Sequence, residues 1–357
     1  MKITVIPAND LTSSHVAAWS RFQQADPELE SPFFRPEFTR LVAETRGDVE
    51  VAILEEDGEP AGFFPFQRRM WGNGTPVGGP LNDFQGVVAR PGLTWHADEL
   101  IRACRLSAWD FDHLLASQQP FQSYHVGTGS SPFLDVSAGF ESYQAESCRN
   151  GSRTIRELPR KIRKVEREVG PVRFELHSPD PNVLTTLFSW KREQYRRTSV
   201  TDVFAYPWTV QLLDRVVRVQ EESFGGMLSA LYFGDRLAAV ELLMRSNGVL
   251  HGWFPAYDPF FGQYSPGMIL VFELARAMPS RGLRRYHMGK GEARHKNSFA
   301  TGTVPLVAGS VALHPLGRML RRGWHRTRNA VRGSRLLAPA RLLGRWTRPL
   351  RGWLAFR

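Results

Sequence analysis

The stretch AYDPFFGQYSPGMILVFELARAM (Ala256–Met278) joins a predicted strand to a predicted helix through an Asp-Pro turn, a glycine and a Ser-Pro-Gly sequence. Ser265 suits an N-cap, Pro266 suits the first helical position, and Gly267 lets another group approach the backbone N–H groups closely. A helix start presents free donors and the positive end of the helix dipole. The segment therefore predicts an anion-binding site, with an ordinary well-capped helix as the alternative.

The elements around this stretch predict an α+β domain. Helical periodicity favours helices over 182–197, 207–221 and 266–279. Strand-like sequence covers 227–233, 236–245, 248–256 and 284–289, and continues to 313. Helices followed by an antiparallel meander, a helix and closing strands are typical of that fold class.

A hairpin pattern occurs twice along the chain. VEVAILEEDGEPAGFFPFQRR turns at Asp57-Gly58, and GMLSALYFGDRLAAVELLMRS turns at Gly234-Asp235. Their exits align Ala61 with Ala238, which lies 177 positions later, a domain-sized step. The repeat predicts two domains, 1–150 and 151–314, and a tail over 315–357.

Composition narrows the class of protein. The chain has 357 residues, 42% of them hydrophobic, which suffices for two cores. Cys104 and Cys148 form neither a disulfide framework nor a zinc-site pattern, so a reducing compartment is expected. No signal peptide or long apolar run is evident, and P-loop, dinucleotide, zinc-protease and esterase motifs are missing. We expect a cytoplasmic protein without a metal.

Positive charge is concentrated at the C-terminus. Residues 316–357 hold twelve arginines and no acid, so subtracting them from the formal charge of +11 leaves −1 for the rest. Apolar residues recur every three or four positions from Leu316 to Val331, and Trp346 and Trp353 follow. A basic amphipathic segment with tryptophans favours peripheral binding to an anionic inner-membrane surface. Packing on the main body, disorder and nucleic-acid binding are the alternatives.

Four ordered motifs carry a resemblance. SPFFRPEF (31–38), VGGPLNDFQGVV (77–88), AYDPFFGQYSPGMIL (256–270) and GKGEARHKNSF (289–299) are similar to the CelD-like acetyltransferases associated with cellulose biosynthesis. That family belongs to the GNAT superfamily and is related to the FemAB-type transferases. The resemblance covers roughly residues 30–310. It implies tandem GNAT-like domains, each a mixed, mostly antiparallel sheet flanked by helices.

The resemblance also implies a donor site. Acyl-coenzyme A would lie between two splayed strands, 248–256 and 284–289, with its pyrophosphate at the start of the following helix. The candidate residues there are Gln263, Ser265, Gly267 and Met268. Pro266 and Met268 stand where the usual coenzyme A loop has glycines, and proline has no N–H to donate. Acetyl-coenzyme A is therefore the expected donor, and FemAB-like use of aminoacyl-tRNA is the alternative.

Four residues are candidates for the chemistry. Glu292 follows a predicted strand and a flexible Gly-Lys-Gly sequence, and it is the first candidate for general base, with a solvated loop acid as the alternative. Lys296 occupies the family's Tyr-Lys position and would bind an anionic donor or acceptor, unless it is an exposed surface lysine. Asp258 either caps its turn or binds acceptor hydroxyls. His287 is a second candidate base or a structural histidine.

Four further residues are candidates for acceptor binding. Asp83 and Gln85 flank Phe84 and either hold sugar hydroxyls or form a structured turn. Trp253 and Tyr257 share one side of an alternating strand, where they either stack on a sugar or fill the core.

These features predict transfer of an acyl group, expected to be acetyl, to an amine or hydroxyl of a sugar, polysaccharide or cell-envelope intermediate. A FemAB-like aminoacyl transferase is one alternative. A non-catalytic envelope or nucleic-acid-binding protein that acts through its basic tail is the other.

Overall fold

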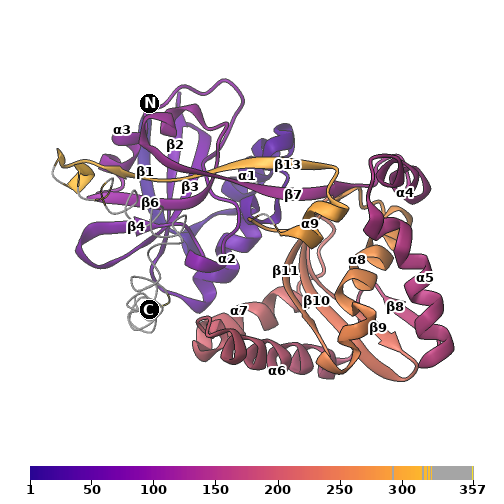
Figure 1. Cartoon of the computed structure of the whole chain (residues 1–357). Coiled ribbons are helices and arrows are strands. Elements are labelled where there is room, and N and C mark those ends of the chain that lie inside the picture. Colours follow the sequence, from indigo (N-terminus) through magenta and orange to yellow (C-terminus); the bar gives the residue numbers. More distant parts are fainter. Residues whose placement is uncertain (292, 316, 320, 322, 324–355, 357) are drawn as a thin grey trace. The chain divides into compact units, whose positions relative to one another are not determined.

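The computed structural model describes residues 1–291, 293–315, 317–319, 321, 323 and 356 (Figure 1). Its contacts divide the chain into two compact units. The first holds residues 1–130 and the segment from 305 onward, and the second holds residues 131–304. The domain boundaries near residues 150 and 314 stay predictions. Most of the candidate tail lies outside the described residues.

The first unit contains a mixed sheet with the strand order β1-β2-β3-β4-β6-β13. Neighbouring strands are antiparallel except for β4 and β6, which are parallel, and the short β5 pairs with β3. Its elements are β1 (Lys2–Pro7), α1 (Ser13–Ala25), α2 (Pro36–Thr45), β2 (Val49–Glu56), β3 (Glu59–Arg68), β4 (Asn73–Thr75), β5 (Val88–Ala89), α3 (Ala97–Ala103), β6 (Ala108–Leu115) and the greater part of β13 (Gly302–Ala312).

The second unit contains a sheet with the order β7-β12-β11-β10-β9-β8, in which only β11 and β12 are parallel among the described pairs. The predicted helices and the strands up to β12 are confirmed, with ends that differ by a few residues. The strand-like sequence expected to continue to 313 was wrong over residues 294–299, where backbone bonds such as Ala300 N–H to the Lys296 carbonyl form the helix α9. Its elements are the end of β7 (His125–Asp135), α4 (Phe140–Arg149), α5 (Arg153–Glu168), β8 (Val172–Glu175), α6 (Pro181–Thr198), α7 (Pro207–Arg218), β9 (Phe224–Phe233), β10 (Arg236–Ser246), β11 (Val249–Tyr257), α8 (Pro266–Ala277), β12 (Arg285–His287) and α9 (Arg294–Phe299).

The two units repeat one topology. Each runs strand, helix, helix, hairpin, third antiparallel strand, helix and a strand parallel to the third. Both predicted hairpins are present, and each has a register shift that leaves one alanine without a partner, Ala61 in β3 and Ala238 in β10. These are the two alanines that the sequence repeat aligns. The tandem GNAT-like fold predicted from the sequence is therefore confirmed.

Helices cover both faces of the second sheet. On one face α8 packs on β9, β10 and β11, and its buried residues share a core with Leu231, Leu243 and Leu250. On the other face α6 contacts β10 and β11, and α7 contacts β9 (Figure 1). β10 is buried along nearly its whole length because it lies between these two layers. A polar side chain on β10 is therefore shielded from water.

Candidate active site

The site is organised by two parallel strands that separate soon after they pair. β11 and β12 pair over three residues, from Val249 opposite Arg285 to His251 opposite His287. β11 continues to Tyr257, and over those residues β10 is its partner among the described strands. The pairing of the two predicted strands thus ends at His251 and His287, and none of the described strands pairs with this edge of β11 beyond His251.

The start of α8 differs from the sequence prediction in its cap. Ser265 occupies the N-cap position and Pro266 the first helical position, as predicted, but the Ser265 hydroxyl makes no capping hydrogen bond. Ser265 has a left-handed backbone (φ 61°), and its carbonyl oxygen accepts from the N–H groups of Met268 (3.0 Å) and Ile269 (3.2 Å). The hydroxyl instead accepts from Nζ of Lys161 at 2.9 Å.

Lys161 brings a positive charge from α5 to this helix start, and the sequence analysis did not identify it. A Cβ added at Gly267 would have no neighbour within 4 Å, so the backbone there is open to an approaching group. α5 is held at α8 by the Tyr264 hydroxyl, which donates to Glu168 at 3.2 Å. Gln263 is exposed on the preceding turn, whereas Met268 packs partly against the core.

A buried carboxylate lies at the point where β11 and β12 separate. Glu241 of β10 is 2% exposed, and its Oε1 accepts a hydrogen bond from the Tyr286 hydroxyl at 2.8 Å. Its Oε2 is also buried and receives no hydrogen bond from the described residues. Gly252 is the first β11 residue beyond the paired segment. A Cβ there would lie 2.4 Å from both Glu241 Oε1 and the Tyr286 oxygen, so only glycine leaves room for this pair.

Burial dominates the electrostatics of this cluster. It raises the pKa of Glu241 from 4.5 to about 7, against the lowering effects of the Tyr286 hydrogen bond, Lys191 and Lys296. Burial also lowers the pKa of Lys191 on α6 from 10.5 to about 8, against the opposing charge of Glu241. The pKa of Tyr286 lies well above its usual value because of burial and the neighbouring Glu241. The cluster therefore contains a carboxyl group and an amine that change protonation near neutral pH.

The structure places three of the four candidate chemical residues. Lys296 is tied to the loop after β12, because its Nζ donates to the carbonyl oxygens of Gly289 (3.0 Å) and Lys290 (3.1 Å). His287 is buried, and its ring centroid lies 6.2 Å from that of His251 at an interplanar angle of 18°. Glu292 lies outside the described residues.

Asp258 has the turn-capping role that the sequence analysis allowed. Its Oδ1 accepts from the Phe260 N–H at 2.9 Å, and its Oδ2 lies 3.2 Å from the Arg236 guanidinium. Along β11 the predicted alternation is confirmed. Trp253 is half-buried, Pro255 is exposed and Tyr257 is 44% exposed, whereas Phe254 and Ala256 between them are buried. Tyr257 therefore presents an aromatic surface beyond the core.

Asp83 and Gln85 lie in the first unit. The Gln85 amide nitrogen donates to Asp112 Oδ1 (2.9 Å) and the Asn82 carbonyl (3.3 Å). Its oxygen accepts from the backbone N–H groups of Asp112 and His113, each at 3.0 Å. Asp83 Oδ1 lies 3.6 Å from His113 Nε2. The Gln85 side chain thus links the loop to β6. These contacts agree with the interpretation of this motif as a structured turn.

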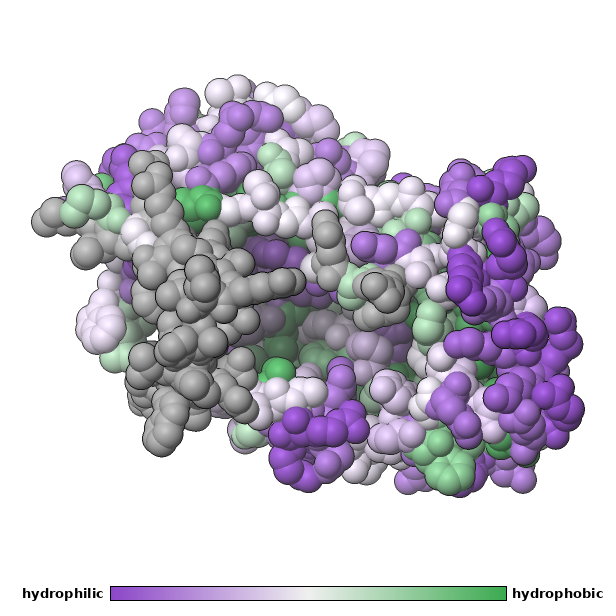
Figure 2. All heavy atoms as spheres, in the orientation of Figure 1, coloured by the Kyte–Doolittle hydropathy of each residue, from purple (hydrophilic) through white to green (hydrophobic). Residues whose placement is uncertain are grey.

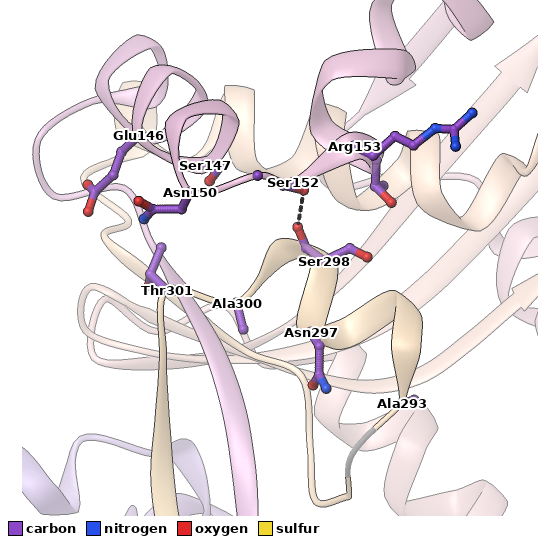
Figure 3. Close-up of a pocket in the computed structure, with 12 residues that line it drawn as sticks. Glu146, Ser147, Asn150, Ser152, Arg153, Ala293, Asn297, Ser298, Ala300 and Thr301 are labelled. Carbon is purple, nitrogen blue, oxygen red and sulfur yellow. Dashed lines mark hydrogen bonds between the residues drawn. The ribbon is translucent and has the colours of Figure 1, made fainter.

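A polar pocket of about 720 Å³ opens between the α4–α5 junction and α9 (Figure 3). The Ser152 hydroxyl donates to the Ser298 carbonyl at 2.7 Å and holds its two sides together. Asn150, Asn297 and Thr301 line it, whereas the Arg153 guanidinium points away (Figure 3). Most of the lining side chains are neutral hydrogen-bonding groups, with Glu146 as the acidic member. The sequence offered no signal for this pocket, because its walls are about 150 positions apart.

The described part of the chain lacks a metal-ligating cluster and a membrane-spanning helix. It contains no group of three or more metal-ligating side chains. None of its helices has both the length and the apolar character needed to cross a bilayer.

The pKa of Glu241 predicts how stability depends on pH. Because folding raises this pKa, its contribution to stability is fully present below pH 4.5 and is lost as the pH rises through about 7, an effect of the order of 3 kcal/mol. The lowered pKa of Lys191 changes the stability between about pH 8 and 10.5, which lies above this range. We expect Glu241→Gln to flatten the decline in unfolding free energy between about pH 5 and 7.5, measured by urea titration.

The exposed carboxyl of Glu221 provides the control for that titration. Glu221→Gln should keep the wild-type decline. An unchanged slope in Glu241→Gln would show that Glu241 is ionised throughout this range.

Comparisons with known proteins agree with the topology. Residues 152–297 match the family model described as an acetyltransferase (GNAT) domain. No curated protein matches the sequence. The fold is similar to that of FemX, with a TM-score of 0.57 and 10% identity over 90% of this chain and 100% of FemX.

Two other solved structures are similar. One is the C-terminal DUF2156 domain of a putative lysylphosphatidylglycerol synthetase from Agrobacterium fabrum, with a TM-score of 0.52 and 13% identity over 85% of this chain and 93% of that chain. The other is a conserved protein of unknown function from Bacteroides thetaiotaomicron, with a TM-score of 0.53 and 9% identity over 85% of this chain and 98% of that chain. The chain therefore has a GNAT-like fold, and its residues 152–297 match the model of a GNAT acetyltransferase domain.

Proposed function

We propose that the protein transfers an acyl group, acetyl from acetyl-coenzyme A, to an amine or hydroxyl of a sugar, polysaccharide or cell-envelope intermediate. One observation carries the proposal: the pairing of β11 with β12 ends at His251, and Lys161 adds a positive charge at the start of α8, the helix that follows β11. The resemblance of four sequence motifs to CelD-like acetyltransferases supports the acetyl donor and the glycan acceptor.

The residues at the start of α8 fit the phosphates of coenzyme A. The backbone at Gly267 is open, and α8 points its positive dipole end at this place. Pro266 has no N–H, but the Lys161 ammonium supplies charge and donors beside it. The edge of β11 beyond His251, with which none of the described strands pairs, offers backbone groups to the extended pantetheine arm. When bound, the thioester supplies an activated acyl carbon.

A lysine variant tests the donor site. Lys161→Ala should weaken acetyl-coenzyme A binding by about 10- to 100-fold, the effect of losing one charged hydrogen bond, as measured by calorimetry. Binding of S-acetylpantetheine, which lacks the phosphates, should stay as it is in the wild type. Arg163→Ala, an exposed position on the same helix, is the matched control.

Two results would contradict this donor site. Equal weakening of both ligands would mean that Lys161 acts on the fold and not on phosphates. A wild-type protein that binds neither of these ligands nor aminoacyl-tRNA would instead favour the non-catalytic binding protein.

A second donor class is favoured by the surface of α5. Hydrophilic residues gather over this helix in Figure 2, and its cationic side chains outnumber its acidic ones. The cationic residues are Arg153, Arg156, Arg160, Lys161, Arg163, Lys164 and Arg167, against Glu157, Glu166 and Glu168. Aminoacyl-tRNA would match a basic helix next to the donor site. Stabilisation by aminoacyl-tRNA but not by acetyl-coenzyme A in a thermal-shift assay would select this donor.

The polar pocket at the α4–α5 junction is the proposed acceptor site. Its amide and hydroxyl groups suit a ligand that presents many hydroxyl groups, and the Glu146 carboxylate suits an amine. α9 connects this pocket to the buried cluster. Asn297 lines the pocket, and the adjacent Lys296 anchors the loop after β12 and acts on the charge of Glu241.

Glucosamine is a suitable probe of this pocket. Asn297→Ala should weaken glucosamine binding about tenfold, because a hydrogen bond is worth about 1 kcal/mol or slightly more, and the dissociation constant from NMR titration would show it. Asn182→Ala, at the start of α6 and outside the pocket, is the control. Equal affinities in the wild type and Asn297→Ala would place the acceptor elsewhere.

Residues 315–357 are proposed to bind an anionic membrane surface, from their sequence alone. Truncation after residue 314 should abolish co-sedimentation with vesicles of phosphatidylglycerol, because it removes the twelve arginines. Vesicles of phosphatidylcholine alone are the control. Full binding by the truncated chain would contradict the proposal.

A further inference from the structure

We propose that Glu241 is the catalytic base of this transfer, taking the proton of the attacking amine or hydroxyl on its Oε2 atom. This inference rests on the proposed function. Glu241 is not among the candidate site residues of the sequence analysis, and it is the one polar residue between Leu237 and Met244 of β10.

Glu241 lies beside the end of the paired segment of β11 and β12. Gly252 follows the last paired residue of β11, and the absence of a Cβ there makes room for the Glu241–Tyr286 pair. The proposed thioester lies between these strands. A carboxylate at the end of the paired segment therefore lies beside the place proposed for the thioester.

The two carboxylate oxygens of Glu241 have different environments. The Tyr286 hydroxyl holds Oε1 at 2.8 Å, which fixes the orientation of the group. Oε2 is buried and has no hydrogen-bond donor among the described residues. A buried polar atom without a partner costs about 1–3 kcal/mol, so a purely structural carboxyl would be expected to use both oxygens. A base needs one oxygen that is held and one whose lone pair no donor occupies, and Oε2 meets the second condition among the described residues.

The charges around Glu241 are suited to proton transfer at neutral pH. Lys191 of α6 and Lys296 of α9 act on the carboxylate, and Tyr286 of β12 donates to it. His251 and His287 occupy the last paired positions of the two diverging strands. Burial outweighs the attraction of the two lysines and raises the pKa of Glu241 to about 7. A base is most effective when its pKa lies near the working pH.

The step balances without a further reagent. The nitrogen or oxygen of the acceptor attacks the thioester carbonyl carbon, its proton passes to Oε2, and the carbon–sulfur bond breaks. The electron pair of that bond leaves with coenzyme A as the thiolate. Glu241 then returns the proton to the thiolate, which gives the free thiol, the acylated acceptor and a carboxylate ready for another cycle.

Thiol release from acetyl-coenzyme A, with water as an acceptor that does not itself titrate near neutral pH, tests the base. We expect kcat/KM of the wild type to rise with an apparent pKa of about 7, and Glu241→Gln to lose this rise and about 10²- to 10⁴-fold in rate. Its affinity for acetyl-coenzyme A should be unchanged. Tyr286→Phe should move the midpoint to higher pH, because the hydrogen bond that lowers the pKa of Glu241 is gone.

Two controls separate a base from a structural carboxyl. Glu273 on α8 is a second carboxyl whose pKa burial raises, and it pairs with Arg276, so Glu273→Gln should keep both the rate and the profile. Glu292→Gln is the rival variant. If the pH-dependent rise disappears in Glu292→Gln and persists in Glu241→Gln, Glu292 is the base and the inference is overturned.

A direct titration covers the case of slow turnover or a poorly folded variant. The carboxyl carbon resonance of Glu241 in ¹³C-glutamate-labelled wild-type protein, assigned by comparison with Glu241→Gln or Gly252→Ala, should titrate between about pH 6 and 8. A group that stays ionised across this range overturns the inference. Failure of acetyl-coenzyme A to bind the wild type overturns the proposed function instead.

Discussion

The brief pairing of β11 and β12 is the constraint on which the second unit depends. Three residues of β12 pair with β11, after which β11 keeps β10 as its partner among the described strands. An open strand edge inside a sheet is ordinarily a site for a further strand. Here α8 starts beyond the end of β11 and packs on the same sheet, so the gap is bounded by a helix start and not by another strand. This arrangement is the structural basis of the proposed donor site.

The same divergence explains the unusual residues around it. Between two fully paired strands, Gly252 would only weaken the sheet, but at the point of separation it makes room for Glu241 and Tyr286. Burial of Glu241 opposes its ionisation, and Lys191 and Lys296 offset only part of that effect. The core therefore retains a carboxyl group that destabilises the fold when ionised. Such a cost is expected where a buried group has a function.

α5 brings a positively charged side chain to the start of α8. Its apolar residues Ile155, Leu158 and Val165 are buried in the core shared with α8, so its opposite face displays the basic residues. Lys161 lies where these two faces meet and reaches Ser265 at the start of α8. α5 thus supplies a hydrogen-bond donor, Lys161, beside Pro266, which has no N–H. The left-handed backbone of Ser265 makes this possible, because its hydroxyl is directed to α5 and not into the helix cap.

Local patterns in the sequence predicted a large part of the architecture. Gly and Asp at two turns predicted both hairpins, Pro266 placed the start of α8, and alternation along β11 placed Trp253 and Tyr257 on one side. The repeat of Ala61 and Ala238 predicted the tandem topology, because an unpaired strand residue requires the same local geometry in both copies. Only the tertiary structure joined Lys161 to Ser265, Glu241 to Tyr286, and Ser152 to Ser298. These pairs are separated by between 45 and 146 positions, and their partners are selected by packing and burial, which no local pattern records.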